Sequence, residues 1–413
     1  MMYLLFYYTE FLHISIEVAA TCYFLASIWD GVASLLVGVI FDRFAGEAQF
    51  QQSLVFGAVP LGLAFIMAYS PPSFGVGVVA WVLSGQILFR SAYALVNVPY
   101  LAMSARISAG TNDRALVAGM RMLAGTAASL LVAIGSAPIG LWLSGGDGAK
   151  VYAQSARIFA VAATAILVGV GLTYRDGAIP LPRNRGSVGG SLLGAWRNRA
   201  FVTLAVSMAT MIIAVTVLNK SILYYFKYRL HDQTAGALTL GWMTAVSGCA
   251  LPIWMLISRA IGVRALWFLA IGLGVIWLGL FIFCELQTTL LTQIFLILMQ
   301  VTIVGLNFAV WAMLPDTVEF GQRATGMRVE AVLYGYVALI QRVAIGLGTV
   351  LLGLSLKQSG FSAVGRQTLA TLAMFRVNLA LVPLGFLLVS AVIMAFNPLR
   401  RGLHDAIIRE IKA

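Results

Sequence analysis

The sequence predicts an all-α integral membrane protein made of two six-helix bundles around a central cavity. Of the 413 residues, 61% are hydrophobic and only 10% are charged, and the chain divides into long apolar runs separated by short polar loops. A helix needs about 20 mostly apolar residues to cross a bilayer, so this composition excludes an ordinary soluble protein. An internal echo, described below, divides the runs into two halves.

The apolar runs define the expected transmembrane helices. The run 1–12 is too short to cross alone, so we expect either a chain that starts late in a truncated first helix or a stub that is completed in another way. No basic segment precedes a small-residue cleavage site, and no cleaved signal peptide is predicted. The other runs are 16–41, 52–70, 76–104, 117–143, 152–173, 201–226, 237–257, 265–284, 288–314, 329–356 and 371–396.

Lysine and arginine in the loops predict the orientation. One set of alternate loops and the tail hold most of them, whereas the other set holds only Lys150, Lys227, Arg229, Lys357 and Arg366. Basic loops stay in the cytoplasm, so both termini are expected to face the cytoplasm from the cell inner membrane. The net charge of +12 is mainly this topology signal, with attraction to the lipid bilayer as a side effect. We expect a monomer and no nucleic-acid partner.

Cofactor and metal motifs are missing from the sequence. Cys22, Cys249 and Cys284 stand singly, and the three histidines are far apart, so no metal-ligand spacing occurs. There is no phosphate-binding glycine loop that would support ATP-driven work. We predict no cofactor and no enzyme activity.

Two segments six spans apart resemble each other. "NVPYLAMSARI" begins at Asn97 and "NFAVWAMLPDT" at Asn307, and a short polar loop follows each. Such an echo is typical of two parallel six-helix repeats with a substrate site near the bilayer midplane. The glycine-rich stretch "RGSVGGSLLG" is expected to be a flexible part of the linker. The predicted domains are 1–174 (first bundle, first helix incomplete), 175–200 (cytoplasmic linker), 201–396 (second bundle) and 397–413 (cytoplasmic tail).

Charged residues inside the spans are the candidates for function. Each costs about 2.5–3.5 kcal/mol at a helix centre unless it is paired or solvated. Asp30, Arg90 and Arg342 lie near the middle of their runs. The charges that lie nearer the ends, where a long side chain can reach the interface, are Arg121, Lys220 and Glu330.

Asp30 has Ser34 one helical turn later, so a carboxylate and a hydroxyl share a face that suits a small cation or a proton. The alternative is an ion pair that only fixes helix packing. Arg90, Tyr93, Asn97 and Leu101 form one stripe of a helix, which indicates cavity lining. The alternative for Arg90 is pairing with a neighbouring carboxylate without contact to substrate.

Several stretches resemble one transporter family in order along nearly the whole chain. They are "FYYTE" (6–10), "IWDGVASLLVGVIFDR" (28–43), "NVPYLAMSARI" (97–107), "WRNRAF" (196–201), "LYYFKYRL" (223–230), "WAMLPDTVEFGQRATGMRVEA" (311–331) and "IQR" (340–342). The chain resembles the glycoside-pentoside-hexuronide:cation symporters. The resemblance implies a major facilitator fold and symport of a sugar-like small-molecule substrate with a coupling cation, by alternating access.

The resemblance also implies roles for residues. Asp30, Ser34 and Asn97 fall on cation-coupling positions of the family. Two of these positions differ from the family: Ser34 stands where the family has a second carboxylate on helix two, and Asn97 stands where it has an Asp that serves both sugar and cation. Leu101 stands in place of a sugar-stacking Trp, and Arg342 replaces a Lys. With Arg90 added from the stripe, the predicted substrate-binding residues are Arg90, Tyr93, Asn97, Leu101, Arg121 and Arg342.

These departures predict a changed solute and a changed ion. Cations outnumber carboxylates inside the spans, and an arginine can hold a carboxylate through two charge-assisted hydrogen bonds. We therefore expect an acidic solute, for example a hexuronide. A lone carboxylate with a hydroxyl is a poor sodium site but can bind a proton, so the coupling ion is expected to be H+ or none rather than Na+.

The stretch "GVIFDR" resembles part of a major facilitator loop motif, in which the Asp caps a neighbouring helix end. The predicted gating residues are Gly38, Asp42, Arg43, Asp316, Glu319 and Arg328.

Other functions stay open at this point. They are a membrane enzyme, which would need a polar catalytic cluster that the sequence does not show; a degenerate carrier that serves as a sensor or subunit; and a transporter of amphiphilic or lipid-like organic acids.

Overall fold

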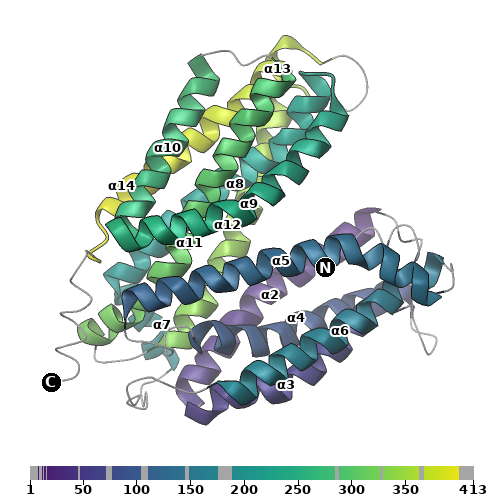
Figure 1. The fold of residues 1–413 in the computed structure, drawn as a ribbon, viewed down its shortest axis with the longest axis vertical. Coiled ribbons are helices and arrows are strands. Elements are labelled where there is room, and N and C mark those ends of the chain that lie inside the picture. The colour runs from purple at the N-terminus through teal and green to yellow at the C-terminus, as the bar shows by residue number, and fades with distance from the viewer. Residues whose placement is uncertain are drawn as a thin grey trace. The chain divides into compact units, whose positions relative to one another are not determined.

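In the residues that it describes, the structure, a computed structural model, consists of helices (Figure 1). It describes residues 8, 12, 14, 16–44, 47–70, 77–103, 110–144, 148–174, 188–283, 288–325, 329–361 and 367–399. The predicted first run 1–12 and the predicted tail 397–413 therefore lie almost wholly outside the described residues.

The described helices follow the apolar runs closely. Eleven of them are long and apolar enough to cross a membrane, and they correspond to the eleven longer runs of the sequence. The helices are α2 (Ile16–Phe44), α3 (Glu47–Ala68), α4 (Val78–Met103), α5 (Thr111–Ser144), α6 (Gly148–Thr173), α7 (Val188–Arg197), α8 (Arg199–Tyr228), α9 (Gln233–Ile261), α10 (Val263–Phe283), α11 (Thr289–Thr325), α12 (Glu330–Gln358), α13 (Leu369–Arg376), a π-helical turn (Val377–Leu381) and α14 (Val382–Ala395).

Large apolar side chains cover much of the described surface. Phe56 is 74% exposed, Leu131 70% and Trp142 81%. In water such a surface would be costly, whereas lipid tails solvate it. The exposure pattern therefore supports the all-helical membrane fold that the composition predicts.

The flexible linker expected around "RGSVGGSLLG" is in part a helix. α7 begins at Val188 and runs through the glycine pair to Arg197. Ala195 is fully buried. An apolar face that packs thus offsets the low helix propensity of glycine, which is where the expectation of a flexible segment was wrong.

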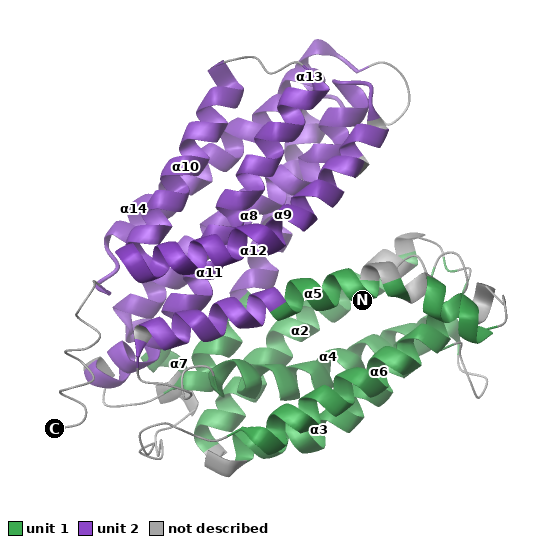
Figure 2. Cartoon of the chain, viewed as in Figure 1, with its two compact units in different colours: residues 1–109, 124–195, 326–339 green, residues 110–123, 196–325, 340–413 purple. Residues whose placement is uncertain are grey.

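The chain forms two compact units (Figure 2). Unit 1 comprises 1–109, 124–195 and 326–339; unit 2 comprises 110–123, 196–325 and 340–413. α5 and α12 are thus each divided between the units. Within unit 1, α4 packs on α2 and α3, and α3 packs on α6. Within unit 2, α8 packs on α14, and α11 packs on α9 and α10.

Candidate functional site

A buried ion pair joins α2 to α4 in unit 1. Arg90 Nη1 donates to Asp30 Oδ2 at 3.0 Å, and both side chains are almost fully buried. Either charge without its partner would carry a high free-energy cost inside the membrane, whereas the paired charges neutralise each other. The structure thus brings together the two central charges of unit 1 and shows the pairing that the sequence left open.

Aromatic and hydroxyl groups surround this pair. The Arg90 guanidinium lies 5.4 Å from the centre of the Tyr23 ring, a cation–π distance. Nearby, Trp29 Nε1 donates to Ser91 Oγ at 2.8 Å, a second polar link between α2 and α4. Ser34, one turn after Asp30, is buried. Asp30 and Ser34 are therefore both buried, and their cation-coupling role stays a prediction.

The predicted stripe on α4 varies in exposure along its length. Arg90 and Leu101 are buried, whereas Tyr93 is 37% exposed and Asn97 lies between these extremes. Tyr93 stacks on Phe89 with ring centres 6.0 Å apart. In the described part of the chain, Asn97 makes no hydrogen bond to Asp30. Tyr93 and Asn97 are thus the members of the stripe that are not fully buried, and their contact with a solute stays a prediction.

The other two predicted substrate-binding residues belong to unit 2. The Arg121 guanidinium on α5 lies 4.6 Å from the centre of the Trp311 ring on α11. This cation–π contact holds Arg121 against α11. Arg342 is half-buried on α12. Both remain predicted solute ligands.

Four predicted gating residues make close helix contacts. Asp42 at the end of α2 accepts hydrogen bonds from the backbone N–H groups of Ala331 (2.9 Å) and Val332 (2.7 Å). These N–H groups lie in the first turn of α12 and have no partner within the helix, so Asp42 caps it. We call these contacts, with those of Gly38 and Gly335, the α2–α12 clamp.

Glycines make the α2–α12 clamp tight. A Cβ atom on Gly38 would lie 2.5 Å from the Ala331 carbonyl oxygen, and one on Gly335 would lie 2.7 Å from the Ser34 carbonyl oxygen. Both neighbours are backbone atoms and cannot swing away. Only glycine permits this approach, which brings the first turns of α12 onto α2 within unit 1.

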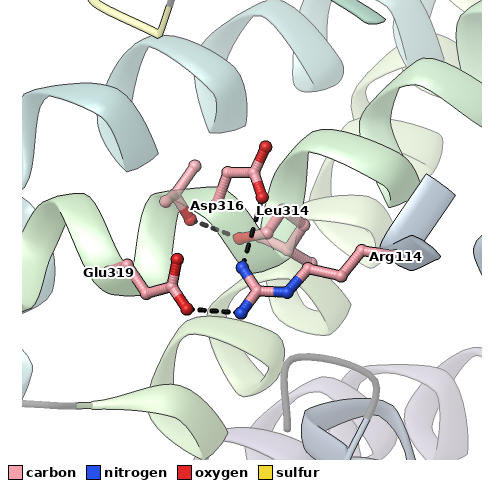
Figure 3. A network of polar contacts seen from close by, with 5 residues as sticks. Arg114, Leu314, Asp316 and Glu319 are labelled. Atoms are coloured by element: carbon pink, nitrogen blue, oxygen red, sulfur yellow. Dashed lines mark hydrogen bonds and ion pairs between the residues drawn. The ribbon is translucent and has the colours of Figure 1, made fainter. Parts of the chain in front are cut away.

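Two further predicted gating residues, Asp316 and Glu319, belong to a buried network in unit 2 (Figure 3). Arg114 Nη1 contacts Asp316 Oδ1 at 3.3 Å, and Arg114 Nη2 donates to Glu319 Oε1. All three side chains are buried. The Thr317 hydroxyl donates to the Leu314 carbonyl at 2.6 Å on the same stretch of α11. One guanidinium thus ties the start of α5 to two carboxylates of α11.

Sequence reasoning missed Arg114. Arg114 belongs to the larger set of basic loop residues from which the orientation is predicted, although it follows the polar segment "TND" at the point where α5 begins. Its signal was the pair Asp316 and Glu319, whose spacing of three residues places two carboxylates on one helix face that needs a cation. Of the other predicted gating residues, Arg43 is exposed and Arg328 lies outside the described residues.

Metal-binding groups are not gathered at these sites. Among the residues that the structure describes, no three His, Cys, Asp or Glu side chains come close enough together to hold a metal ion.

Three relatives found by comparison with known proteins are named as transporters, carriers or symporters. The chain is 25% identical to the Inner membrane symporter YicJ of Escherichia coli, over 95% of this chain and 86% of that one. It is 25% identical to the Glucuronide carrier protein homolog of Escherichia coli (99% and 90%). It is 22% identical to the Isoprimeverose transporter of Lactiplantibacillus pentosus (95% and 83%).

Solved structures agree on the fold. The major facilitator superfamily transporter FucP, in its outward conformation, matches with a TM-score of 0.66 at 10% identity, over 91% of this chain and 89% of that one. The proton:xylose symporter XylE matches with a TM-score of 0.65 at 13% identity, over 95% and 90%. The model of the family described as MFS/sugar transport protein matches residues 1–401. The chain is therefore a multi-pass membrane transporter, not an enzyme, and belongs to the MFS/sugar transport protein family.

Proposed function

We propose that this protein is a secondary symporter that moves a sugar-like acid together with a proton, by alternating access across the inner membrane. The names of the relatives support the solute class, since one is a glucuronide carrier homolog and another an isoprimeverose transporter. The first name refers to an acidic sugar derivative and the second to a neutral sugar. The choice of acid and of proton rests on the charges inside the helices.

The observation that carries the proposal is the Asp30–Arg90 ion pair. Sodium and other hard cations need several oxygen ligands, and Asp30 with Ser34 offers few. The Arg90 guanidinium, 3.0 Å away, also repels a metal cation from the same carboxylate. A proton needs one oxygen and no coordination shell, so it is the coupling ion that this site suits.

The same pair couples proton to acid. A proton on Asp30 would leave the Arg90 charge buried without a negative partner, which is strongly unfavourable. A solute that brings its own negative charge offsets that loss. Proton and acid therefore enter together more favourably than either enters alone.

Two contacts would then control movement. The α2–α12 clamp holds the first turns of α12, and the Arg114 network holds the first turns of α5. Each helix continues into the other unit. We propose that release of these contacts accompanies the change of access.

Uptake into proteoliposomes tests the proposal. We would compare phenyl glucuronide with phenyl glucoside, which differ in one carboxylate, under an inward proton or sodium gradient. We expect proton-driven accumulation of the glucuronide, loss of that accumulation in Asp30→Asn, and no loss in Asp113→Asn, which changes an exposed carboxylate on α5. Sodium-driven uptake that Asp30→Asn abolishes would contradict the proposal.

A further inference from the structure

Lys220 is an exposed cation within the span of α8, and no carboxylate balances its charge in the described part of the chain. Its Nζ donates to the Thr349 hydroxyl at 2.8 Å, from α8 to α12 within unit 2. No ion pair between described residues includes Lys220. A hydroxyl orients an ammonium without neutralising it. This lysine therefore differs from Arg90 and Arg114, which each have carboxylate partners.

Lys220 lies well before the end of α8. It lies eight residues before Tyr228, where α8 ends, which is about 12 Å along the axis. Lys227 occupies the end of the helix, with its Nζ 5.0 Å from the centre of the Tyr228 ring. The Lys220 ammonium is instead held sideways against α12.

The packing of α8 on α12 fixes this geometry. A Cβ atom on Gly348 would lie 2.9 Å from Thr216 Cβ and 3.2 Å from the Ile213 carbonyl oxygen, so the helices touch just beside Thr349. The Thr349 hydroxyl donates to the Ile345 carbonyl at 2.7 Å, which leaves its oxygen free to accept from Lys220. An ammonium has three donors, and this contact uses one of them.

A second positive charge lies along the same face of α12. Arg342 precedes Thr349 by seven residues, which is two helical turns. A charge inside a membrane protein persists where it meets a counter-charge or serves a substrate. We propose that Lys220, positioned by Thr349, binds the carboxylate of the transported solute. The inference rests on the proposed function and names the residue of unit 2 that makes the carrier prefer acids.

The test compares half-saturating concentrations for phenyl glucuronide and phenyl glucoside in proteoliposomes. In Lys220→Gln we expect the value for the glucuronide to rise about ten-fold or more, since a hydrogen bond to a charged group is lost, and the value for the glucoside to change less than about two-fold. Lys227→Gln, the same substitution seven residues further along α8, should change neither. Thr349→Val should raise the value for the glucuronide a few-fold, and Thr349→Ser should not.

The outcomes separate this inference from the proposed function. If the parent moves the glucuronide and Lys220→Gln leaves its half-saturating concentration unchanged, the inference is overturned while the function stands. If the parent moves only the glucoside, both the acid substrate and the inference fail. Should Lys220→Gln not fold, Thr349→Val decides, and an unchanged glucuronide value in that variant overturns the inference.

Discussion

The two units each place a basic side chain well inside a membrane-spanning helix, and they treat its charge in opposite ways. In unit 1, Arg90 is buried and pairs with Asp30 at 3.0 Å. In unit 2, Lys220 is exposed and meets only the Thr349 hydroxyl among its described contacts. A neutralised charge holds helices together, whereas a charge without a partner is available to a ligand. On the proposal made for Lys220, the presence or absence of a counter-charge distinguishes the two residues, whereas position within the span does not.

Removal of one member of the Asp30–Arg90 pair should have the largest effect. Arg90→Gln or Asp30→Asn leaves a buried charge without a partner, and we expect a loss of about 3–5 kcal/mol in the free energy of unfolding. The double variant should recover most of that loss. Thermal unfolding of the purified protein in detergent measures the loss of stability in each variant. Lys220→Gln leaves no buried charge without a partner and should lose less than about 1 kcal/mol. A large loss of stability in Lys220→Gln would contradict the proposed difference between the Arg90 and Lys220 charges.

The Arg114 network sharpens the comparison within unit 2. Arg114→Gln leaves both Asp316 and Glu319 without their shared cation, so we expect a loss of about 3 kcal/mol. Asp316→Asn should cost only about 1 kcal/mol, because Glu319 still pairs with Arg114. The same unfolding assay compares the two variants. Equal losses would mean that Asp316 and Glu319 do not share the arginine as the structure indicates.

The glycine contacts of the α2–α12 clamp should give an intermediate effect. Gly335→Ala pushes a methyl group against the Ser34 carbonyl, and forced packing of this kind costs about 1–3 kcal/mol. Gly353→Ala on the same helix meets no atom within 4 Å and should be neutral or slightly stabilising. Solute exchange rates and unfolding temperatures measure both variants. Equal behaviour of the two glycines would argue against the clamp.

The Asp42 cap should give the smallest effect. Asp42→Ala removes the acceptor for the Ala331 and Val332 N–H groups, and loss of such a cap costs about 0.5–2 kcal/mol. Asp42→Asn keeps an acceptor and should retain most of the stability. If Asp42→Ala has no effect on stability or on exchange rate, the cap plays no part in gating.

Much of the fold followed from the sequence, because spans depend on apolar length alone. The runs 16–41 and 371–396, for example, correspond closely to α2 and to the segment from α13 to α14. The ion pair did not follow in the same way. Asp30 and Arg90 are 60 residues apart, so two alternatives stayed open until the packing of α2 on α4 joined them.

The candidate site shows the same limit. Arg114 lies at the start of α5, where the sequence indicates an ordinary loop charge, and only the arrangement of α5 and α11 reveals that it is buried. For Lys220, the sequence shows that a long side chain can reach the interface, but it does not show that Gly348 brings α12 next to α8 beside Thr349. Contacts between distant segments decide both cases.

The most direct test of the account compares two variants in one exchange assay, with phenyl glucuronide and phenyl glucoside as solutes. The account predicts that the double variant Asp30→Asn with Arg90→Gln keeps its preference for the glucuronide, because Lys220 remains to bind the solute carboxylate, although loss of the Asp30–Arg90 pair ends the coupling of that solute to protons. It predicts that Lys220→Gln loses the preference. The reverse result, with the preference lost in the double variant and kept in Lys220→Gln, would contradict the account, because the preference for the acid would then depend on Arg90 and not on Lys220.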